Sequence, residues 1–376
     1  MVPDLAHHRA GVASASLPRV CIVGPFPPPS GGMANQCQQL IQLLKSEGIE
    51  VKFVRTNSPY QPMWAGKIPV LRSFFRLFPY LVNLWRTTPK VDVVHLLANS
   101  GWAWHLFSTP VILIGRLRGT PVIVNYRGGN ADTFFAATPK YVLSMLAKVS
   151  MRVTPSVFLQ RVFAKHGLGA VVIPNIIDLS RFSPRVPRAF GDAPHIIVTR
   201  NLEPIYDIPT AIQAFMLIKK ALPGATMTVA GSGPELANLQ GLVSTLGLAG
   251  SVKFAGRIDN ASIPSLYASA DCMINSSMVD NMPISILEAF ASGVPVISTD
   301  AGGIPDLVGR NVTGLLVPIA DSDAIAREVL RVLQDADLAA DLTRAALAEA
   351  QKYAWPEVRA KWLAAYVDAA RHGNAS

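Results

Sequence analysis

The stretch "VDNMPISILEAFASGVPVI", residues 279–297, places two acids, Asp280 and Glu288, eight positions apart in a mainly apolar segment. Pro283 suits the first turn of a helix, and the apolar residues after it recur at helical spacing. A small-residue turn then leads into the β-type run of residues 294–297. We therefore expect a helix whose start is flanked by both acids and which leads directly into a strand.

The same alternation of strand and helix patterns continues on both sides of this stretch. The β-type runs are mostly continuous and apolar, as in parallel strands covered on both faces. They read "RVCIV", "VKFV", "DVVHL", "PVIVNY", "RVTP" and "AVVIP", then "HIIVT", "TMTVAG", "VKFAG", "DCMINS", "PVIST" and "GLLVP". The proline-rich segment 178–195 separates the two groups. We expect two doubly wound α/β domains, residues 19–186 and 187–352.

The two ends of the chain have different expected roles. Residues 1–18 lack the apolar core of a signal peptide and are predicted to be a flexible lead-in. The tail within residues 353–376 is an amphipathic helix, which we expect to cross back to the first domain. The sequence predicts no membrane span, and its three scattered cysteines are too few for a disulfide framework or a zinc site. These features favour a cytoplasmic protein.

Charge is distributed unevenly between the two halves. Up to Arg188 there are 21 Lys plus Arg against 6 Asp plus Glu, a net charge of +15, whereas the remainder has 13 against 19, a net charge of −6. This asymmetry predicts an anionic partner for the first half. Nucleic acid, an anionic membrane or a phosphorylated lipid would each fit, but no nucleic-acid-binding motif is present, so we expect no nucleic acid partner.

Three motifs lie where predicted strands end, which is the edge where open α/β sheets bind ligands. Gly31 and Gly32 open a helix after the first strand, and glycines there let backbone N–H groups approach an anion. Arg127 follows "PVIVNY" and suits a phosphate, and Arg200 follows "HIIVT" and can clamp a diphosphate. Each of these motifs, taken alone, is also compatible with a turn that binds no ligand. The two acids, taken alone, are also compatible with a helix that has one acid at its N-terminus and one glutamate exposed to solvent.

Taken together, these residues resemble a known family. Asp280 and Glu288 match its E-x7-E motif, and further pieces match over roughly residues 19–370: "PSVFLQRVF", "VIPNIIDLSRF", "VAGSGPE", "VKFAGRI", "LYASADCMINSS" and "YAWPEVRAKWLAAYVDA". The chain is similar to the retaining glycosyltransferases of family 4, the glycogen-synthase-like group 1 enzymes. The resemblance implies the GT-B architecture, two Rossmann-like domains facing across a cleft.

The resemblance also implies roles for individual residues. Glu288 would bind the ribose of a nucleotide-diphosphate sugar, Asp280 would lie near its sugar, and Arg200 would act on its diphosphate. The remaining donor-binding residues implied are Gly31, Gly32, Tyr206, Gly231, Gly233, Arg257, Ile258, Asn281, Met282 and Pro283. The expected catalytic residues are Arg200, Asp280 and Arg127, and no metal or cofactor is expected.

The sequence departs from the family pattern at four places. Tyr206 takes the place of the lysine that follows the diphosphate-binding arginine, and this removes one cation. Arg127 replaces a histidine, which would restore a positive charge. The usual "PNG" reads "PNI", with Ile176 in the glycine position, and the first acid is Asp280 rather than a glutamate.

The resulting expectation is a retaining, metal-independent glycosyltransferase of bacterial surface-polysaccharide biosynthesis. It would transfer a sugar from a nucleotide sugar to a glycan or a polyprenyl-diphosphate-linked acceptor. The alternatives are a catalytically weakened GT-B-like sugar-binding protein and a nucleotide-sugar epimerase. Residues 66–90 mix Lys67, Arg72, Arg76, Arg86 and Lys90 with Phe74, Phe75, Phe78, Tyr80, Leu81 and Trp85. This pattern predicts peripheral docking on an anionic membrane, although a crossover helix with core aromatics would look the same.

Overall fold

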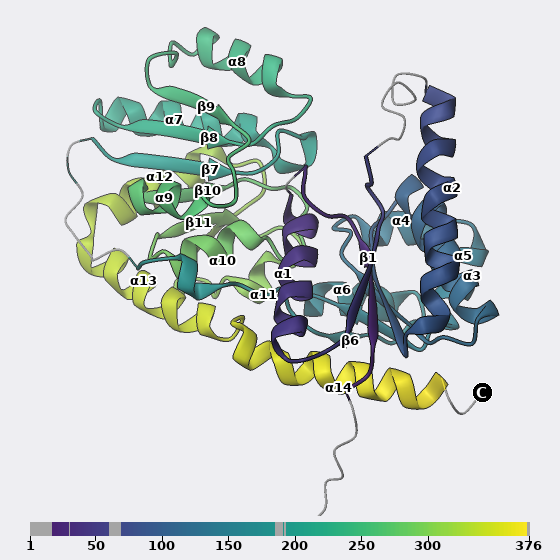
Figure 1. Cartoon of the computed structure of the whole chain (residues 1–376). Helices are drawn as coiled ribbons and strands as arrows, with labels where there is room; N and C mark the ends of the chain where they lie inside the picture. The colour runs from purple at the N-terminus through teal and green to yellow at the C-terminus, as the bar shows by residue number, and fades with distance from the viewer. Residues whose placement is uncertain (1–16, 30, 60–68, 185–190, 192, 374–376) are drawn as a thin grey trace, which may run out of the picture.

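The computed structural model describes residues 17–29, 31–59, 69–184, 191 and 193–373, which form two α/β domains side by side (Figure 1). The first domain holds a parallel sheet in the order β2-β1-β3-β4-β5-β6. Its strands are β1 (Val20–Gly24), β2 (Val51–Arg55), β3 (Val93–Ala98), β4 (Val122–Tyr126), β5 (Met151–Thr154) and β6 (Val171–Val172). Every predicted run of the first half contributes a strand, but "AVVIP" pairs over two residues only.

The second domain holds a second parallel sheet of six strands, in the order β12-β11-β10-β7-β8-β9. Its strands are β7 (His195–Thr199), β8 (Thr226–Ala230), β9 (Val252–Gly256), β10 (Cys272–Asn275), β11 (Val296–Thr299) and β12 (Leu315–Val317). Strand order reverses between β1 and β3 in one sheet and between β7 and β10 in the other. A doubly wound sheet binds ligands at such a reversal, beyond the carboxyl ends of its strands.

Helices cover both faces of each sheet (Figure 1). Those of the first half are α1 (Gly32–Ser46), α2 (Pro69–Thr87), η2 (Thr88–Lys90), η3 (Trp104–Ser108), α3 (Thr109–Leu117), α4 (Ala131–Ala137), α5 (Lys140–Ala147), α6 (Val157–Lys165) and η4 (Leu179–Arg181). Those of the second half are η5 (Pro204–Tyr206), α7 (Ile208–Ala221), α8 (Leu236–Thr245), α9 (Ile263–Ser269), α10 (Ile284–Ala291), α11 (Ile304–Leu307), α12 (Ser322–Gln334), α13 (Ala336–Gln351) and α14 (Trp355–Gly373).

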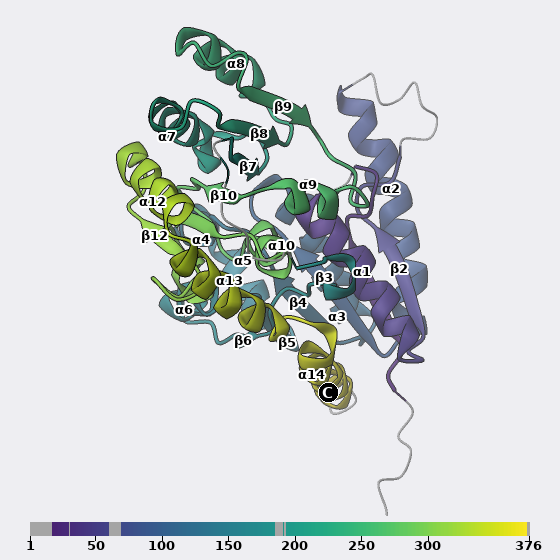
Figure 2. The ribbon, with the colours of Figure 1, turned by 90° about the vertical axis from the view of Figure 1, so that its left-hand side faces the viewer.

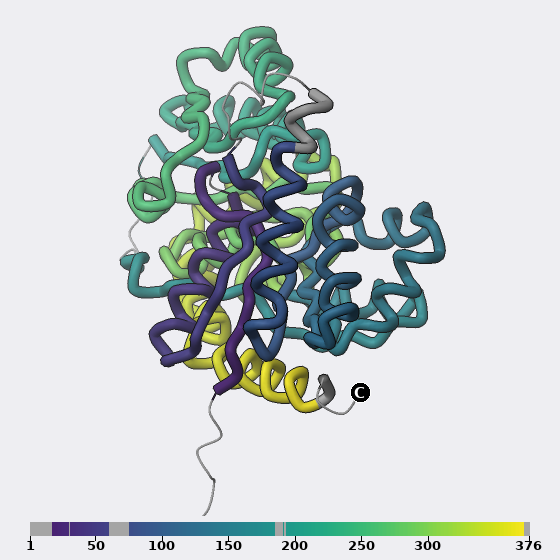
Figure 3. The backbone as a smooth tube through the Cα atoms, turned by 45° about the vertical axis from the view of Figure 1, so that its right-hand side comes forward, coloured from purple at the N-terminus to yellow at the C-terminus, as the bar shows by residue number. Residues whose placement is uncertain are grey.

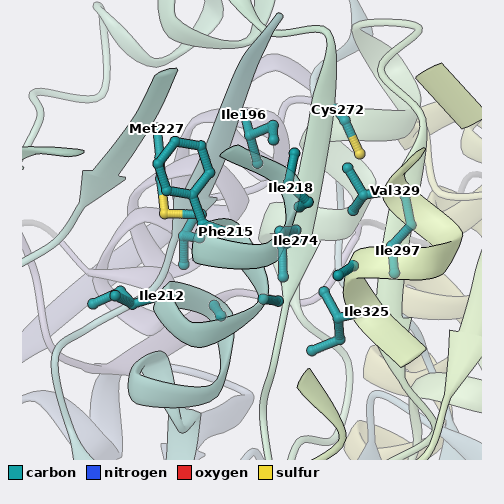
Figure 4. Close-up of a cluster of buried hydrophobic side chains, with 14 of the residues drawn as sticks. Ile196, Ile212, Phe215, Ile218, Met227, Cys272, Ile274, Ile297, Ile325 and Val329 are labelled. Atoms are coloured by element: carbon teal, nitrogen blue, oxygen red, sulfur yellow. The ribbon is translucent and has the colours of Figure 1, made fainter. Parts of the chain in front are cut away.

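The continuous apolar runs become strands because both faces of each sheet are buried. In the second domain, alternate residues of β7 point to opposite faces, so that Ile196 packs under α7 and α12 while Ile197 packs under α10. Figure 4 shows the first of these cores, where Phe215 of α7 and Ile325 of α12 meet Ile274 of β10. The two cores hold the carboxyl ends of β7 and β10 in fixed positions beside the cavity between the domains.

The C-terminal helix packs on the domain opposite to the one it follows in sequence. α13 lies along the second domain, and α14 continues beneath the first (Figures 1 and 2). Figure 3 shows α14 passing under the first sheet, toward the C-terminus. Val358, Trp362 and Tyr366 of α14 are buried in the same core as Val20 and Ile22 of β1. The chain thus crosses between the domains twice, between β6 and β7 and again before α14.

The segment with the predicted membrane pattern forms α2, and the structure divides its aromatic residues. Tyr80 is only 4% exposed, and its hydroxyl donates to the carbonyl of Phe107 at 2.6 Å, so the interpretation of Tyr80 as a membrane-facing residue is wrong. Phe78 and Trp85 are exposed, as the pattern predicted. Residues 66–68 and the side chains of residues 69–74 lie outside what the structure describes. None of the described helices is long and apolar enough to cross a membrane.

Candidate active site

A cavity of about 720 Å³ lies between the two domains, at the carboxyl ends of both sheets. On the first-domain side it is lined by residues at the start of α1, after β3 and after β4, among them Gly31, Gly32 and Arg127. On the second-domain side it is lined by residues after β7, β8 and β9 and at the start of α10. Apart from Gly233, every residue predicted to bind the donor or to act in catalysis lines this cavity.

The glycine turn after β1 places the start of α1 opposite the start of α10. Gly31 caps α1 in an extended conformation and, as a glycine, contributes no side chain to the cap. A Cβ on Gly32 would lie 3.6 Å from the Cδ1 of Ile284, the first residue of α10. Two helix N-termini therefore face the same cavity, and both favour negative charge there.

Arg127 emerges from the end of β4 and reaches the segment that leads out of the first domain. Its Nη1 donates to the Oδ1 of Asn175 at 2.8 Å, and the Nδ2 of Asn175 donates to the carbonyl of Met282 at 3.0 Å. The Nε of Arg127 is buried and has no hydrogen-bond partner among the described residues. Burial lowers the pKa of Arg127 to about 10, so the guanidinium remains charged at neutral pH. This relay of hydrogen bonds ties Arg127 to the loop before α10.

Arg200 and Asp280, 80 residues apart in sequence, form an ion pair in the second-domain wall of the cavity. The Nη2 of Arg200 contacts the Oδ2 of Asp280, while the Oδ1 of Asp280 accepts from the backbone N–H of Asn281 at 2.7 Å. The Arg200 Cζ lies 4.2 Å from the centre of the Tyr206 ring, which is a cation–π distance. Without a donor bound, the cation expected to hold a diphosphate is thus neutralised by the acid expected to orient its sugar.

Glu288 lies on the side of α10 that faces the cavity, next to a buried tyrosine. The hydroxyl of Tyr267 is 3.2 Å from the Oε2 of Glu288 and 2.9 Å from the carbonyl of Ser285. Burial raises the pKa of Glu288 to about 7, and the Tyr267 hydrogen bond opposes that rise. The carboxyl group therefore titrates near neutral pH. α10 starts at Ile284, so Pro283 precedes the first turn as an extended cap rather than lying within it.

Two glycines that no sequence motif singled out hold the loop before α10 in place. A Cβ on Gly302 would lie 2.1 Å from the carbonyl oxygen of Asp280, and one on Gly303 would lie 2.1 Å from that of Asn281. Gly302 also has a φ of +57°, a conformation that side chains rarely adopt. The signal was present as "DAGGIP" after β11, but only the folded chain shows which backbone these glycines approach.

The other predicted donor residues fall into two groups. Gly231, Arg257 and Ile258 line the cavity after β8 and β9. Gly233 is not among the lining residues, and a Cβ there would lie 2.2 Å from the carbonyl oxygen of Leu202. Its observed role is to let the β8 loop pack against the loop after β7. Donor contact by Gly233 stays a prediction.

Contacts within the first domain and between the two domains surround the cavity. Within the first domain, the side-chain amide of Gln36 in α1 donates to the carbonyl of Ile176 at 2.7 Å and accepts from its N–H at 2.9 Å. The Ser156 hydroxyl contacts the Asn281 side chain, and Arg161 pairs with Asp306 at 2.7 Å. Among the described residues, no group of three or more His, Cys, Asp or Glu could hold a metal ion.

Comparison with known proteins agrees with this geometry. Residues 180–349 match the model of the family described as glycosyl transferases group 1. This match supports a relationship of the chain to the group 1 glycosyltransferases. The matched region contains three residues that carry the group 1 resemblance, namely Arg200, Asp280 and Glu288.

Curated relatives and solved structures extend the similarity to most of the chain. A GDP-mannose-dependent alpha-(1-6)-phosphatidylinositol monomannoside mannosyltransferase of Mycobacterium tuberculosis is 27% identical over 349 residues, which cover 85% of this chain and 89% of the relative. A phosphatidyl-myo-inositol mannosyltransferase of Mycolicibacterium smegmatis is 24% identical over 364 residues, covering 89% and 90%. The crystal structure of Anabaena HepE with UDP-glucose has a TM-score of 0.72 at 18% identity, covering 93% and 99%. Sucrose-phosphate synthase of Thermosynechococcus elongatus has a TM-score of 0.75 at 21% identity, covering 95% and 100%. The fold is that of the GT-B glycosyltransferases.

Proposed function

We propose that this chain is a retaining glycosyltransferase that takes a sugar from a nucleotide-diphosphate sugar and passes it to a glycan or a lipid-linked acceptor. The observation that carries the proposal is that Arg200, Asp280 and Glu288 line one cavity at the carboxyl ends of the strands. They supply a cation for a diphosphate and carboxylates for ribose and sugar hydroxyls. The mannosyltransferase relatives support a sugar-transfer reaction on a lipid acceptor.

Each residue has a distinct part in the proposed reaction. Glu288 holds the donor by its ribose, and the start of α10 faces the diphosphate. As the bond from the sugar to the diphosphate breaks, negative charge grows on the leaving group, and Arg200 stabilises it. Asp280 exchanges its pairing with Arg200 for contacts with the donor sugar. The acceptor hydroxyl attacks from the face that the diphosphate leaves and passes its proton to an oxygen of the departing diphosphate, which retains the anomeric configuration. Because Arg200 supplies the positive charge, we propose that no divalent metal is required.

The donor is tested first by binding and then by turnover. The full-length protein is screened for thermal stabilisation by a panel of UDP- and GDP-sugars, and the stabilising donors are then assayed for hydrolysis and transfer in the presence of a chelator. Transfer or hydrolysis that persists in chelator supports the proposal. A donor that binds but is never cleaved would favour the catalytically weakened alternative, and an epimerised sugar produced without an acceptor would favour the epimerase.

We also propose that the enzyme works on the cytoplasmic face of an anionic membrane, in surface-polysaccharide assembly. Phe78 and Trp85 are exposed on α2, which lies on the outer side of the first domain (Figure 1), and this domain belongs to the half of the chain that carries the excess of positive charge. A lipid-linked acceptor would be presented at that surface. The polysaccharide role is supported by the similarity to a putative colanic acid biosynthesis glycosyltransferase of Escherichia coli, 29% identical over 159 residues that cover 41% of this chain and 39% of the relative.

A further inference from the structure

The two walls of the cavity differ in charge. Among the described lining residues up to Ile177, the only charged side chain is that of Arg127 and none is acidic. The wall from Asp178 onward carries both signs, with Asp178, Glu203, Asp280 and Glu288 against Arg181, Arg200 and Arg257. The first-domain wall is therefore a positive surface that no lining carboxylate neutralises.

The rest of that wall consists mainly of neutral hydrogen-bonding groups. Amide side chains line it at Asn35, Gln36, Gln38, Gln39, Gln42, Asn99, Asn130 and Asn175. Amides donate to and accept from sugar hydroxyls, and they also donate to phosphate oxygens. A ligand that combines hydroxyl groups with one anionic group fits this wall better than a neutral sugar does.

Arg127 provides the strongest evidence for that anionic group. Arg127 is partly buried, and withdrawing a guanidinium from water is costly unless an anion or several acceptors satisfy it, yet the one side chain to which it donates among the described residues is the neutral amide of Asn175. Its Nε is buried without a hydrogen-bond partner in the part of the chain that the structure describes. Arg200, on the opposite wall, already has Asp280 as its anionic partner. The Nε of Arg200 is likewise buried without a hydrogen-bond partner among the described residues, so what distinguishes the two arginines is that Arg200 has an anionic partner and Arg127 has none within the described part of the chain.

We propose that Arg127 binds a phosphate or diphosphate group of the acceptor substrate, so that the enzyme acts on phosphorylated acceptors. This inference rests on the proposed glycosyl transfer and specifies its acceptor. The relay from Arg127 through Asn175 to the carbonyl of Met282 places this group beside the donor loop. The acceptor phosphate then lies close to the hydroxyl that receives the sugar. The start of α1, at Gly32, opens into the same cavity and adds a favourable dipole.

The test uses inorganic pyrophosphate as the probe and the full-length protein saturated with UDP or GDP, whichever raises its melting temperature more. Pyrophosphate binding is measured by titration calorimetry in the unaltered protein and in Arg127→Gln, which preserves a donor to Asn175. We expect at least about tenfold weaker pyrophosphate binding in Arg127→Gln, the loss of one charge-assisted contact. Nucleotide affinity should change less than about twofold. Arg127→Lys, which keeps the charge, should bind pyrophosphate with intermediate affinity.

Arg200→Gln is the matched control, because it removes a cation from the opposite wall. It should weaken nucleotide binding and leave pyrophosphate binding at the second site in place. The proposal is overturned if nucleotide and pyrophosphate exclude each other, or if Arg127→Gln weakens both ligands equally, since Arg127 would then serve the donor. Failure of either kind leaves donor binding by Glu288 and Arg200 intact, so it is distinguishable from failure of the proposed function.

Two further probes identify the source of the phosphate. A hexose 1-phosphate represents a free sugar phosphate, and farnesyl diphosphate represents a lipid-linked carrier. Arg127-dependent binding that is tighter for farnesyl diphosphate assigns the site to a lipid-linked acceptor, and equal or tighter binding of the hexose phosphate assigns it to a soluble one. Binding of both probes that is unchanged in Arg127→Gln and in Arg127→Lys would overturn the proposal, even where the variants fold as judged by circular dichroism.

Discussion

Arg200 forms an ion pair with Asp280, so the Asp280 carboxylate competes with the donor's diphosphate for Arg200. Removing the carboxylate charge should therefore free the arginine. We expect Asp280→Asn to bind UDP or GDP more tightly, by up to about tenfold, while sugar transfer falls because the donor sugar loses a carboxylate contact. Titration calorimetry and turnover measure the two effects. Asp280→Glu is the control and should retain both properties, and weaker nucleotide binding in Asp280→Asn would contradict the competition.

Glu288 should make donor binding depend on pH. Burial raises the pKa of its carboxyl group to about 7, so the protonated form dominates in the free protein below neutral pH. Hydroxyl groups donate more strongly to the carboxylate than to the acid, so donor affinity should rise with pH. We expect about a tenfold increase between pH 6 and pH 8, the change in ionised fraction for this pKa. Glu288→Gln should bind the donor more weakly, and its affinity should not rise with pH. If the variant kept the pH profile of the unaltered protein, Glu288 would be excluded as the cause of the pH dependence.

The raised pKa of Glu288 also determines how the stability of the protein changes with pH. Between the ordinary pKa of a glutamate and about 7, the folded state holds a proton that the unfolded state releases. The contribution of Glu288 to the free energy of unfolding therefore falls as pH rises through this window. The ligand-free protein is most penalised where the donor binds best, and a bound ribose offsets the penalty.

At the level of residues, the sequence predicted which side chains reach the cavity but not what they contact there. Arg127 and Arg200 could be placed because each follows a strand and parallel strands end at a common edge. The pairing of Arg200 with Asp280 joins positions 80 residues apart in sequence. Strand periodicity contains no information on the distance between two such loops. Tyr267 was missed for a similar reason, since nothing local distinguishes it from a core tyrosine.

At the level of elements, the loop before α10 depends on a close backbone approach from the loop after β11. Gly302→Ala would bring a Cβ within 2.1 Å of the Asp280 carbonyl oxygen, at a φ of +57°. We expect the free energy of unfolding to fall by about 1–3 kcal/mol or more and donor affinity to fall with it. Gly309→Ala is the control, because its Cβ would meet Val312 at an ordinary 3.4 Å. Equal melting temperatures for the two variants would refute the steric argument.

The outer helices of the first domain extend the membrane-docking hypothesis beyond α2. Trp102 is 80% exposed and Leu117 of α3 is 75% exposed, and neither was singled out in the sequence. α3 packs beside α2, where the Arg118 guanidinium lies 4.0 Å from the centre of the Trp85 ring. No acidic residue occurs in α2, η3, α3 or α5. Apolar side chains among basic ones match an anionic bilayer surface.

Vesicle co-sedimentation measures this docking. The protein should bind anionic vesicles, with binding reversed by salt, and should bind zwitterionic vesicles weakly. Reversing the charge of the exposed Arg86 and Arg116 to glutamate should lower anionic binding by at least about tenfold, at roughly 1 kcal/mol per basic residue. The control is the same reversal at Arg327 and Arg344, on the second domain. Equal binding to both lipids, or to neither, would eliminate the hypothesis and leave the transferase assignment unaffected.

At the level of the whole molecule, composition and pattern predicted the two parallel sheets, because strands buried on both faces leave continuous apolar runs. The division of α2 into a buried and an exposed side could not be predicted, since core aromatics and membrane-facing aromatics have the same periodicity. Only the folded chain shows that Tyr80 lies on the buried side, where its hydroxyl donates to the Phe107 carbonyl. The position of α14 likewise could not be predicted, because the surface on which it packs forms only when two other parts of the sequence fold together.

The packing of α14 makes the stability of the first domain depend on the end of the chain. Trp362 is 1% exposed and stacks on the buried His95 of β3 with ring centres 4.5 Å apart. The His95 Nδ1 lies 2.8 Å from the Tyr366 hydroxyl, and its Nε2 lies 3.1 Å from the Asn125 amide. Burial lowers the pKa of His95 to about 3, so the imidazole stays neutral and both ring nitrogens are satisfied.

Removing the indole should therefore weaken the first domain selectively. We expect Trp362→Ala to cost about 3–5 kcal/mol, and Tyr366→Phe, which leaves one histidine nitrogen unpaired, about 1–3 kcal/mol. Calorimetry of Trp362→Ala should resolve a first transition at reduced temperature, while the transition stabilised by UDP or GDP stays near its original temperature, because the proposed nucleotide site is in the second domain. Lys361→Ala, an exposed change on the same helix, is the control. If Trp362→Ala lowered both transitions equally, α14 would stabilise the pair of domains as one unit rather than the first domain alone.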